Sequence, residues 1–148
     1  MLLGGRAPDG REYRLIARRY DRGDLCMSVE LRGPDVTGEA CGGFNYRDRP
    51  SRPAFAPIIN DQTCADSWVY GSTPTGVASV EATFAKGPRS VLTRSPPALA
   101  RLPFRGRVFV VAAPGRQTVT AVTARAPDGR VVERNRRGLI DSISICRE

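Results

Sequence analysis

The sequence predicts an all-β fold: an antiparallel β-sandwich, immunoglobulin-like or jelly-roll-like, with about eight to ten short strands. Several segments alternate apolar and polar residues with a period of two, and no long segment carries a helical stripe. Turn signals such as Pro-Asp-Gly and Gly-Pro-Asp separate these segments. The length of 148 residues indicates a single domain, residues 1–148, with a core of its own.

Alternation is clearest in the first half over residues 13–18 and 24–32. From Leu25 to Leu31 the apolar residues fall on the odd positions, which predicts a half-buried strand. The stretch Tyr46–Asn60 contains three prolines and three arginines and is predicted to be a long irregular loop. Such a loop is either functional or a flap over the core, and the sequence favours neither.

The second half holds most of the predicted strands. Residues 78–84 alternate in the same way, whereas 107–113 are apolar on both faces, as in a central strand. One helical turn is expected over Pro96–Arg101. The remaining strands are predicted over residues 117–126, 130–133 and 141–146.

A six-residue repeat, Arg-Ala-Pro-Asp-Gly-Arg, occurs at Arg6–Arg11 and again at Arg125–Arg130. It is a duplicated binding loop, a trace of two halves from an ancient duplication, or one favourable hairpin turn adopted twice. The flanking residues do not align well, which favours a turn adopted twice.

The chain has four cysteines: Cys26, Cys41, Cys64 and Cys146. They form no Cys-x-x-Cys pair of the kind used in zinc sites, so we expect two disulfides and an oxidising compartment. We favour Cys26–Cys41 and Cys64–Cys146, because a hairpin turn over residues 33–38 would bring the first two together. The alternative is four buried free thiols in a cytosolic protein.

Charge is distributed unevenly along the chain, which has a net charge of +8. Residues 82–148 hold 13 basic and 4 acidic side chains, a net +9, whereas residues 1–81 have a net charge of −1. This indicates either an anionic partner or a solvated arginine-rich surface. Few aromatic residues lie among the arginines, so support for nucleic-acid binding is weak. The candidate polyanion-binding residues are Arg125, Arg130, Arg134, Arg136 and Arg137.

Histidine is absent, which excludes Ser-His-Asp and Cys-His catalysis and histidine-ligated zinc. The acidic residues are scattered, and we expect no cofactor, no metal and no enzymatic activity. A small hydrolase built on two carboxylates stays open as an alternative. Trp68 and Tyr70 are either a ligand platform, for example for a sugar, or core side chains, and the core is the stronger expectation.

Several strand-and-turn motifs resemble secreted actinobacterial β-sandwich proteins of unknown function. These motifs lie at Gly23–Cys26, Ala40–Gly42, Tyr70–Val80, Arg107–Val111 and Pro127–Arg130. The resemblance extends over about residues 7–133. It implies an exported, non-catalytic β domain, sometimes beside a membrane anchor, and it carries no known active site.

We therefore expect an extracytoplasmic, disulfide-bonded, non-catalytic module with a binding or structural role, located outside the cell or on its surface. Its partner would be an unidentified protein or a cell-surface polymer. The longest apolar run, Val108–Ala113, is too short to span a membrane. The first residues lack the pattern of a signal peptide, so we expect a mature form or an excised domain. Polyanion binding through the basic half and carboxylate-based hydrolysis are the alternatives.

Overall fold

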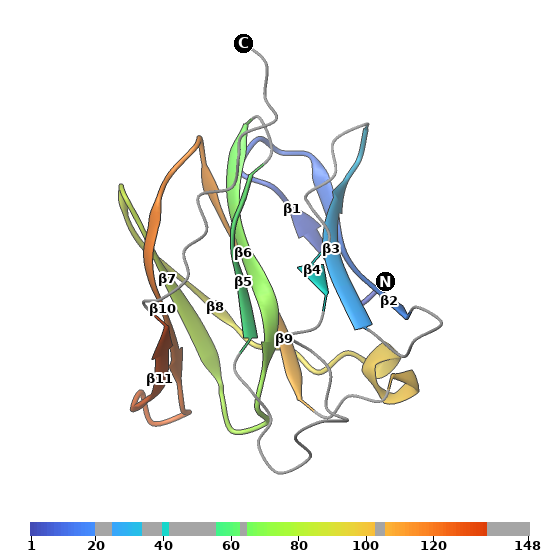
Figure 1. The fold of residues 1–148 in the computed structure, drawn as a ribbon, viewed down its shortest axis with the longest axis vertical. Coiled ribbons are helices and arrows are strands. Elements are labelled where there is room, and N and C mark those ends of the chain that lie inside the picture. The colour runs from blue at the N-terminus through green and yellow to red at the C-terminus, as the bar shows by residue number, and fades with distance from the viewer. Residues whose placement is uncertain (20–24, 34–39, 42–55, 63–64, 103–105, 136–148) are drawn as a thin grey trace.

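The computed structural model describes residues 1–19, 25–33, 40–41, 56–62, 65–102 and 106–135 (Figure 1). This part of the chain is mostly β-strand and forms three antiparallel sheets. The all-β prediction is confirmed. The strands form three sheets, however, whereas a sandwich has two. The predicted strand at 141–146 lies outside the described residues.

The first sheet is built from the N-terminal strands and has the order β1-β2-β3-β4. Its strands are β1 (Leu3–Arg6), β2 (Glu12–Arg19), β3 (Leu25–Leu31) and β4 (Ala40–Cys41). Met27, Val29 and Leu31 of β3 belong to the core as predicted, and Met27 and Val29 are completely buried. The expectation of a half-buried strand was wrong, because Cys26 and Ser28 on its other face are buried as well.

The middle sheet has the order β5-β6-β9, with β5 (Ala56–Gln62), β6 (Asp66–Thr73) and β9 (Arg107–Pro114). The loop predicted over Tyr46–Asn60 was therefore wrong at its end, because β5 begins at Ala56. The third sheet has the order β11-β10-β7-β8. It comprises β7 (Ser79–Phe84), β8 (Gly87–Leu92), β10 (Val119–Arg125) and β11 (Val131–Asn135).

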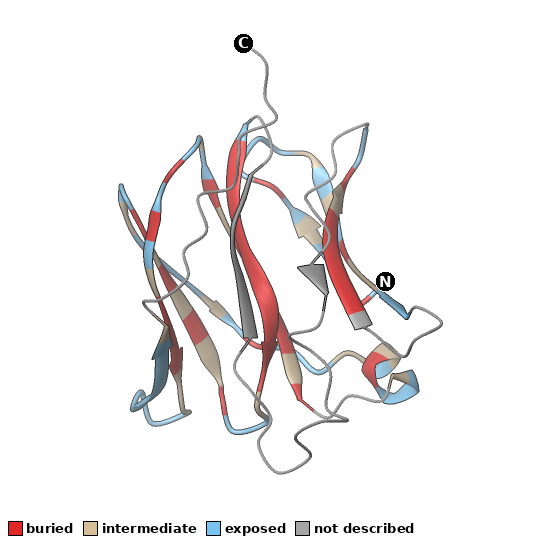
Figure 2. Cartoon of the chain, in the orientation of Figure 1, coloured by how far each residue is buried: buried red, intermediate tan, exposed pale blue. Residues whose placement is uncertain are grey.

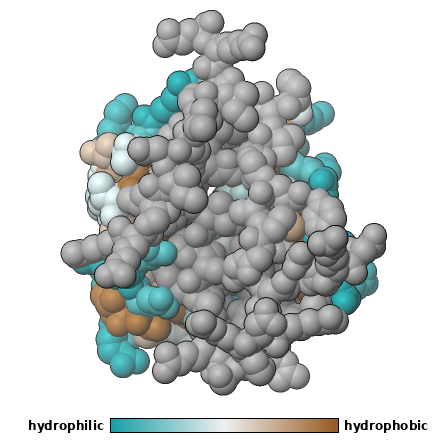
Figure 3. Space-filling view, viewed as in Figure 1, coloured by the Kyte–Doolittle hydropathy of each residue, from teal (hydrophilic) through white to brown (hydrophobic). Residues whose placement is uncertain are grey.

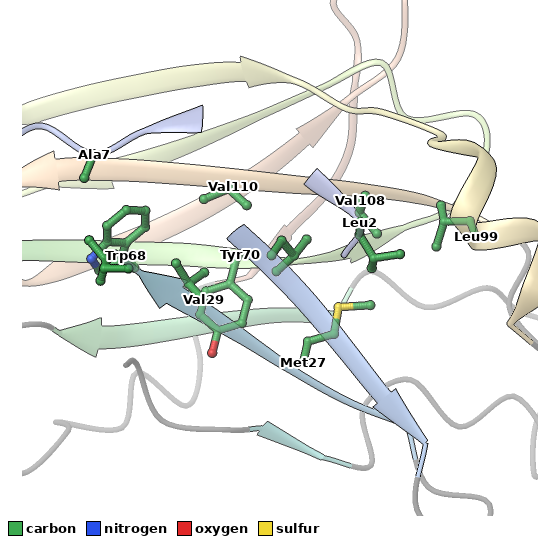
Figure 4. Close-up of a cluster of buried hydrophobic side chains, with 11 residues drawn as sticks. Leu2, Ala7, Met27, Val29, Trp68, Tyr70, Leu99, Val108 and Val110 are labelled. Atoms are coloured by element: carbon green, nitrogen blue, oxygen red, sulfur yellow. The ribbon is translucent and has the colours of Figure 1, made fainter. Parts of the chain in front are cut away.

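The middle sheet is covered on both faces, so that every residue of β6 is buried (Figure 2). Trp68 and Tyr70 point toward the first sheet and join one core cluster with Met27 and Val29 (Figure 4). Val69, between them in sequence, belongs to a second cluster shared with the third sheet. Successive side chains of β6 therefore enter two different cores, one on each face of the middle sheet. The three sheets are stacked as three layers, with the middle sheet between the other two.

β9 behaves in the same way as β6. Val108 and Val110 lie in the first cluster, and Phe109 and Val111 lie in the second. The prediction that 107–113 is buried on both faces is confirmed. Beyond β9 the sheet continues only as a single antiparallel bridge between Val108 and Arg94. The helical turn expected over Pro96–Arg101 is a 3₁₀-helix, η1 (Pro97–Arg101), and its Leu99 caps the first cluster.

The two copies of the six-residue repeat form the same hairpin turn. In the first copy the N–H of Arg11 donates to the Asp9 carboxylate at 3.0 Å, and in the second the N–H of Arg130 donates to Asp128 at 2.9 Å. Both turns end on a glycine of positive φ, at +88° and +85°. The first turn joins β1 to β2 and the second joins β10 to β11. The repeat is thus one turn used in two different sheets.

Candidate functional site

Two adjoining pockets lie between β1, at the edge of the first sheet, and the end of β8, at the edge of the third. Both are lined by Leu3, Leu92 and Arg94. The pocket that also includes Arg107 has a cavity volume of about 510 Å³, and the pocket that includes Tyr13 about 390 Å³. We call these two pockets together the β1–β8 groove. Their volumes fall in the range of small-ligand sites.

Tyr13 forms one wall of the groove and is held from two sides. Its ring meets that of Trp68 edge-on, with the centroids 5.2 Å apart. On the other side it lies against the backbone of Gly5, its partner across the β1–β2 ladder. Burial raises the pKa of the Tyr13 hydroxyl, and the nearby charge of Arg94 partly opposes that rise. The hydroxyl is therefore a neutral hydrogen-bonding group within reach of the Arg94 charge.

Arg107 is fixed in place by the buried Thr93. Its Nε donates to the Thr93 hydroxyl at 2.7 Å, and its Nη2 donates to the Thr93 carbonyl at 2.9 Å. The same hydroxyl donates to the carbonyl of Val77 at 2.7 Å, which locks its orientation. Two guanidinium nitrogens are thus occupied, and no described residue accepts a hydrogen bond from the third, Nη1.

Arg94 has a rigid backbone and an exposed side chain. Its N–H and C=O exchange hydrogen bonds of 2.8 Å with those of Val108 on β9. Among the described residues, Arg94 and Arg107 form no ion pair, and none that lines the groove is acidic. Two arginines beside an apolar surface, without a described carboxylate, favour binding of an anionic group.

A third hollow, of about 440 Å³, lies over β2 and β3 and is a weaker candidate. Most of its charges are already paired: Arg32 lies 3.7 Å from Glu12, and Glu30 accepts from Arg18 at 2.7 Å. Its lining holds two acidic and two basic side chains, so it offers no net charge to a ligand.

Trp68 and Tyr70 do not form the ligand platform considered from the sequence. Both are completely buried in the first core cluster, where neither ring presents a face to solvent (Figure 4). The correction has a simple cause. β6 is the central strand of the middle sheet, so its even and odd side chains both enter a core.

The backbone register agrees with one of the two predicted disulfides. Cys26 and Cys41 are direct partners in the β3–β4 ladder. Such partners have Cα atoms about 4.5–5.5 Å apart, which falls within the range that a disulfide spans. Cys26 is disulfide-bonded in the structure. Cys64 and Cys146 lie outside the described residues, so their pairing stays a prediction.

The basic residues of the C-terminal half are spread over several elements. Arg125 and Arg134 lie on the third sheet, where Arg134 donates to the Thr123 hydroxyl at 3.0 Å. Arg125 donates to the carbonyl of Gly129 at 3.1 Å, and its guanidinium lies 4.0 Å from Glu81. Arg130 lies in the turn before β11. Arg136 and Arg137 lie outside the described residues.

The surface near these arginines is not purely basic. Val131 and Val132 of β11 are each 46% exposed, and Figure 3 shows apolar colour over this strand. Glu133 is exposed between them and Arg134. The described part of the basic half therefore mixes charge of both signs with apolar side chains.

Among the described residues, Asp66 and Asp9 are the one pair of carboxylates in which the charge of one raises the pKa of the other. Burial raises the pKa of Asp66, and the charge of Asp9 raises it further. Asp66 accepts hydrogen bonds from the backbone N–H groups of Asp9 and Gly115, which oppose the rise. Only 1% of Asp66 is exposed, so a substrate cannot reach it. The pair ties the β1–β2 turn to β6 and gives no support to a hydrolase.

Comparisons with protein-family models, curated proteins and solved structures found no match to this chain. Within the described residues, no helix is long and apolar enough to cross a membrane. The same residues contain no group of three or more His, Cys, Asp or Glu side chains that could hold a metal ion.

Sequence reasoning did not identify the groove. Arg107 was one arginine among many in the basic half, and neither Arg94 nor Tyr13 lies in a recognisable motif. Tyr13 is distant in the chain from the two arginines, and the three residues border one groove only because β1 and the end of β8 line it together. The available signal was the pair Gly4-Gly5 in a strand, because glycine there often marks a close backbone approach.

Proposed function

We propose that this chain is a non-catalytic binding module that works outside the cytoplasm, with the β1–β8 groove as its ligand site. One observation carries the proposal: Arg94 and Arg107 line an apolar groove and form no ion pair with a described carboxylate. Arg107 is held in place by Thr93 and the Arg94 side chain is exposed, and a preformed cationic groove suits an anionic ligand.

The extracytoplasmic location is supported by the cysteines. Cys26 is disulfide-bonded and faces Cys41 in the ladder. Disulfides of this kind persist in oxidising compartments and are rare in the cytosol. We further propose that the layered sheets belong to the sandwich class, with the middle sheet packed on both sides.

The absence of catalysis is supported by the groove lining. Among the described residues its polar side chains are Arg94, Arg107, a neutral Tyr13, the exposed Ser95 and a buried Thr93 whose hydroxyl is already committed. A hydrolase would need a general base to activate a hydroxyl or a water, and no described lining residue is a carboxylate, a histidine or a lysine.

The proposal is tested by titrating the ¹⁵N-labelled protein with sodium acetate, inorganic phosphate and an acidic peptide. We expect backbone and arginine Nε–H signals to shift at Tyr13, Arg94 and Arg107, with each probe recovered unchanged. Arg94→Gln and Arg107→Gln should abolish these shifts, whereas Arg89→Gln, an exposed arginine of β8 outside the groove, should not.

Two outcomes would overturn this assignment. Shifts that cluster away from the groove, or that survive both groove substitutions, would show that the groove is not the ligand site. Conversion of the peptide into cleaved products by the purified protein, lost in a groove variant, would show that the module is an enzyme.

A further inference from the structure

The outer edge of β1 presents backbone groups to the groove. The N–H of Ala7 donates to the carbonyl of Arg11 at 2.8 Å, which makes these two a hydrogen-bonded pair. Alternate pairs of an antiparallel ladder bond to each other, so Gly5 bonds toward β2 while Gly4 and Arg6 point their N–H and C=O groups away from it.

The neighbouring strand supports this orientation. The carbonyl of Glu12, which is opposite Arg6, accepts from the N–H of Arg32 on β3 at 2.9 Å. The backbone of Glu12 therefore also points away from β1, as expected for a pair that exchanges no hydrogen bonds. Among the described strands, β1 pairs with β2 alone.

Of the two edges that flank the groove, β1 is better suited to accept another strand. Gly4 is exposed, lines the groove and has no side chain to hinder a second backbone. β8 carries Pro88, which has no N–H, and the exposed Arg89, two features that discourage pairing at an edge.

The rest of the groove selects the side chains of such a strand. Leu3, Val91 and Val110 supply an apolar surface, and Leu92 beside them is 71% exposed. Arg94 and Arg107 supply positive charge without a described carboxylate partner. An extended peptide places alternate side chains on opposite faces, so apolar and acidic residues in alternation would match both features.

We propose that the ligand of the β1–β8 groove is an extended segment of another protein, with alternating apolar and acidic residues, that adds as a strand to β1. Its backbone would bond to Gly4 and Arg6, and its carboxylates would meet Arg94 and Arg107. This mode of recognition takes affinity from the main chain and specificity from alternate side chains. The inference rests on the proposed function, because it names the ligand class of the same groove.

The test measures binding of a fluorescein-labelled peptide, acetyl-Thr-Val-Glu-Val-Glu-Val-Thr-amide, by fluorescence anisotropy at low ionic strength. Gly4→Pro removes the outward N–H of Gly4 and leaves the hydrogen bonds to β2 in place, since Gly4 makes none with its partner Arg14. Gly4→Ala is the matched control, because it keeps the N–H and its Cβ would meet only an ordinary contact of 3.5 Å.

We expect Gly4→Pro to weaken binding about tenfold or more and Gly4→Ala to change it less than about threefold. Arg94→Gln and Arg107→Gln should each weaken it at least about tenfold, and Arg89→Gln should not. A peptide with glutamine in place of glutamate should bind the wild-type protein about as weakly as the glutamate peptide binds the Arg94→Gln and Arg107→Gln variants. Circular dichroism and thermal unfolding establish that each variant is folded.

Failure of this inference can be told apart from failure of the proposed function. Peptide binding that depends on Arg94 and Arg107 but is equal in Gly4→Pro and Gly4→Ala would overturn strand addition and leave the groove as the site. Binding that is equal with glutamine and glutamate would overturn the acidic ligand. Acetate shifts at Arg94 and Arg107 without any peptide binding would overturn the peptide class, whereas no response to any probe would overturn the groove itself.

Discussion

Tyr13 fills the space that a side chain at Gly5 would need. The two residues are direct partners in the β1–β2 ladder, and a Cβ atom built on Gly5 would lie 2.7 Å from two ring carbons and the hydroxyl oxygen of the tyrosine. The ring also meets Trp68 in the core. An aromatic side chain folded over a cross-strand glycine thus links the edge of the first sheet to the middle sheet.

Gly5→Ala is expected to destabilise the protein by about 1–3 kcal/mol, because the ring of Tyr13 must move from a packed position. Gly4→Ala, one residue away and with an ordinary contact, should cost much less. Urea unfolding of the two variants measures the difference. In a Tyr13→Leu background the cost of Gly5→Ala should fall, and an equal cost in both backgrounds would show that the ring is not the obstacle.

Gly10→Ala and Gly129→Ala should destabilise the protein by similar amounts, about 1 kcal/mol each. The two glycines have φ of +88° and +85°, and a Cβ at either would meet nothing within 4 Å. The cost is therefore that of the backbone conformation alone. Asparagine at the same positions should cost less, since it tolerates this region better. Clearly unequal values from thermal unfolding would show that the two copies of the turn are not equivalent.

Stability should depend on pH in opposite senses at Asp66 and Asp9. Burial raises the pKa of Asp66 above its ordinary value of 3.8, so folding favours its protonated form. Its contribution to the free energy of unfolding falls as pH rises from about that value through the raised pKa. Hydrogen bonds from Arg11 lower the pKa of Asp9, so its contribution is present at neutral pH and is lost as pH falls through the lowered value.

Urea unfolding between acid and neutral pH separates these two effects. Relative to wild type, Asp66→Asn should gain stability as pH rises above 3.8, whereas Asp9→Asn should lose stability as pH rises toward 3.8 from the lowered pKa of Asp9. Asp128→Asn is the control for Asp9, because Asp128 accepts the matching hydrogen bond in the second copy of the turn and is not among the groups that shift the pKa of Asp66. If the free energy of unfolding relative to wild type changed with pH in the same direction for Asp66→Asn and Asp9→Asn, the opposite pKa shifts of the two carboxylates would be contradicted.

The four cysteines should be oxidised, as Cys26–Cys41 and Cys64–Cys146. The even count and the ladder position of Cys26 opposite Cys41 are the grounds for the first pair, and the second follows from what remains. Peptide mapping without reductant identifies the bridges. Loss of one bridge should cost about 3 kcal/mol. Alkylation of four thiols in the native protein would remove both the bridges and the main support for export.

Binding of the protein to heparin should be weak, lost at high salt and carried mainly by Arg134, Arg136 and Arg137. Three nearly contiguous arginines attract polyanions, and each phosphate contact on duplex DNA contributes a salt slope of about −0.9. Replacing all three by glutamine should lower heparin-column retention clearly, and Arg89→Gln, outside the β1–β8 groove, serves as a single-charge control. Unchanged elution of the triple variant would refute the cluster, and tight binding that survives high salt would indicate a specific site.

The sequence predicted elements whose two faces differ. β2 and β7 have one core face and one outer face, so their side chains alternate and their positions were predicted closely. The position of β3 was predicted equally well from its sequence alternation, although its other face is buried too. The repeated turn was equally readable, because the requirement for glycine at positive φ is local. β6 was missed: Asp66–Thr73 is buried on both faces, mixes Ser, Thr and Gly with large apolar residues, and so shows no alternation.

Local composition determined this protein's β class, its turns and its inward-facing residues, because each depends on neighbours along the chain. Tertiary structure decided that the strands form three layers, which made Trp68 and Tyr70 core residues instead of a platform. It also decided that Tyr13, Arg94 and Arg107 border the same groove. That arrangement depends on which edges of different sheets lie side by side, and no periodicity within one strand encodes how strands of different sheets are placed.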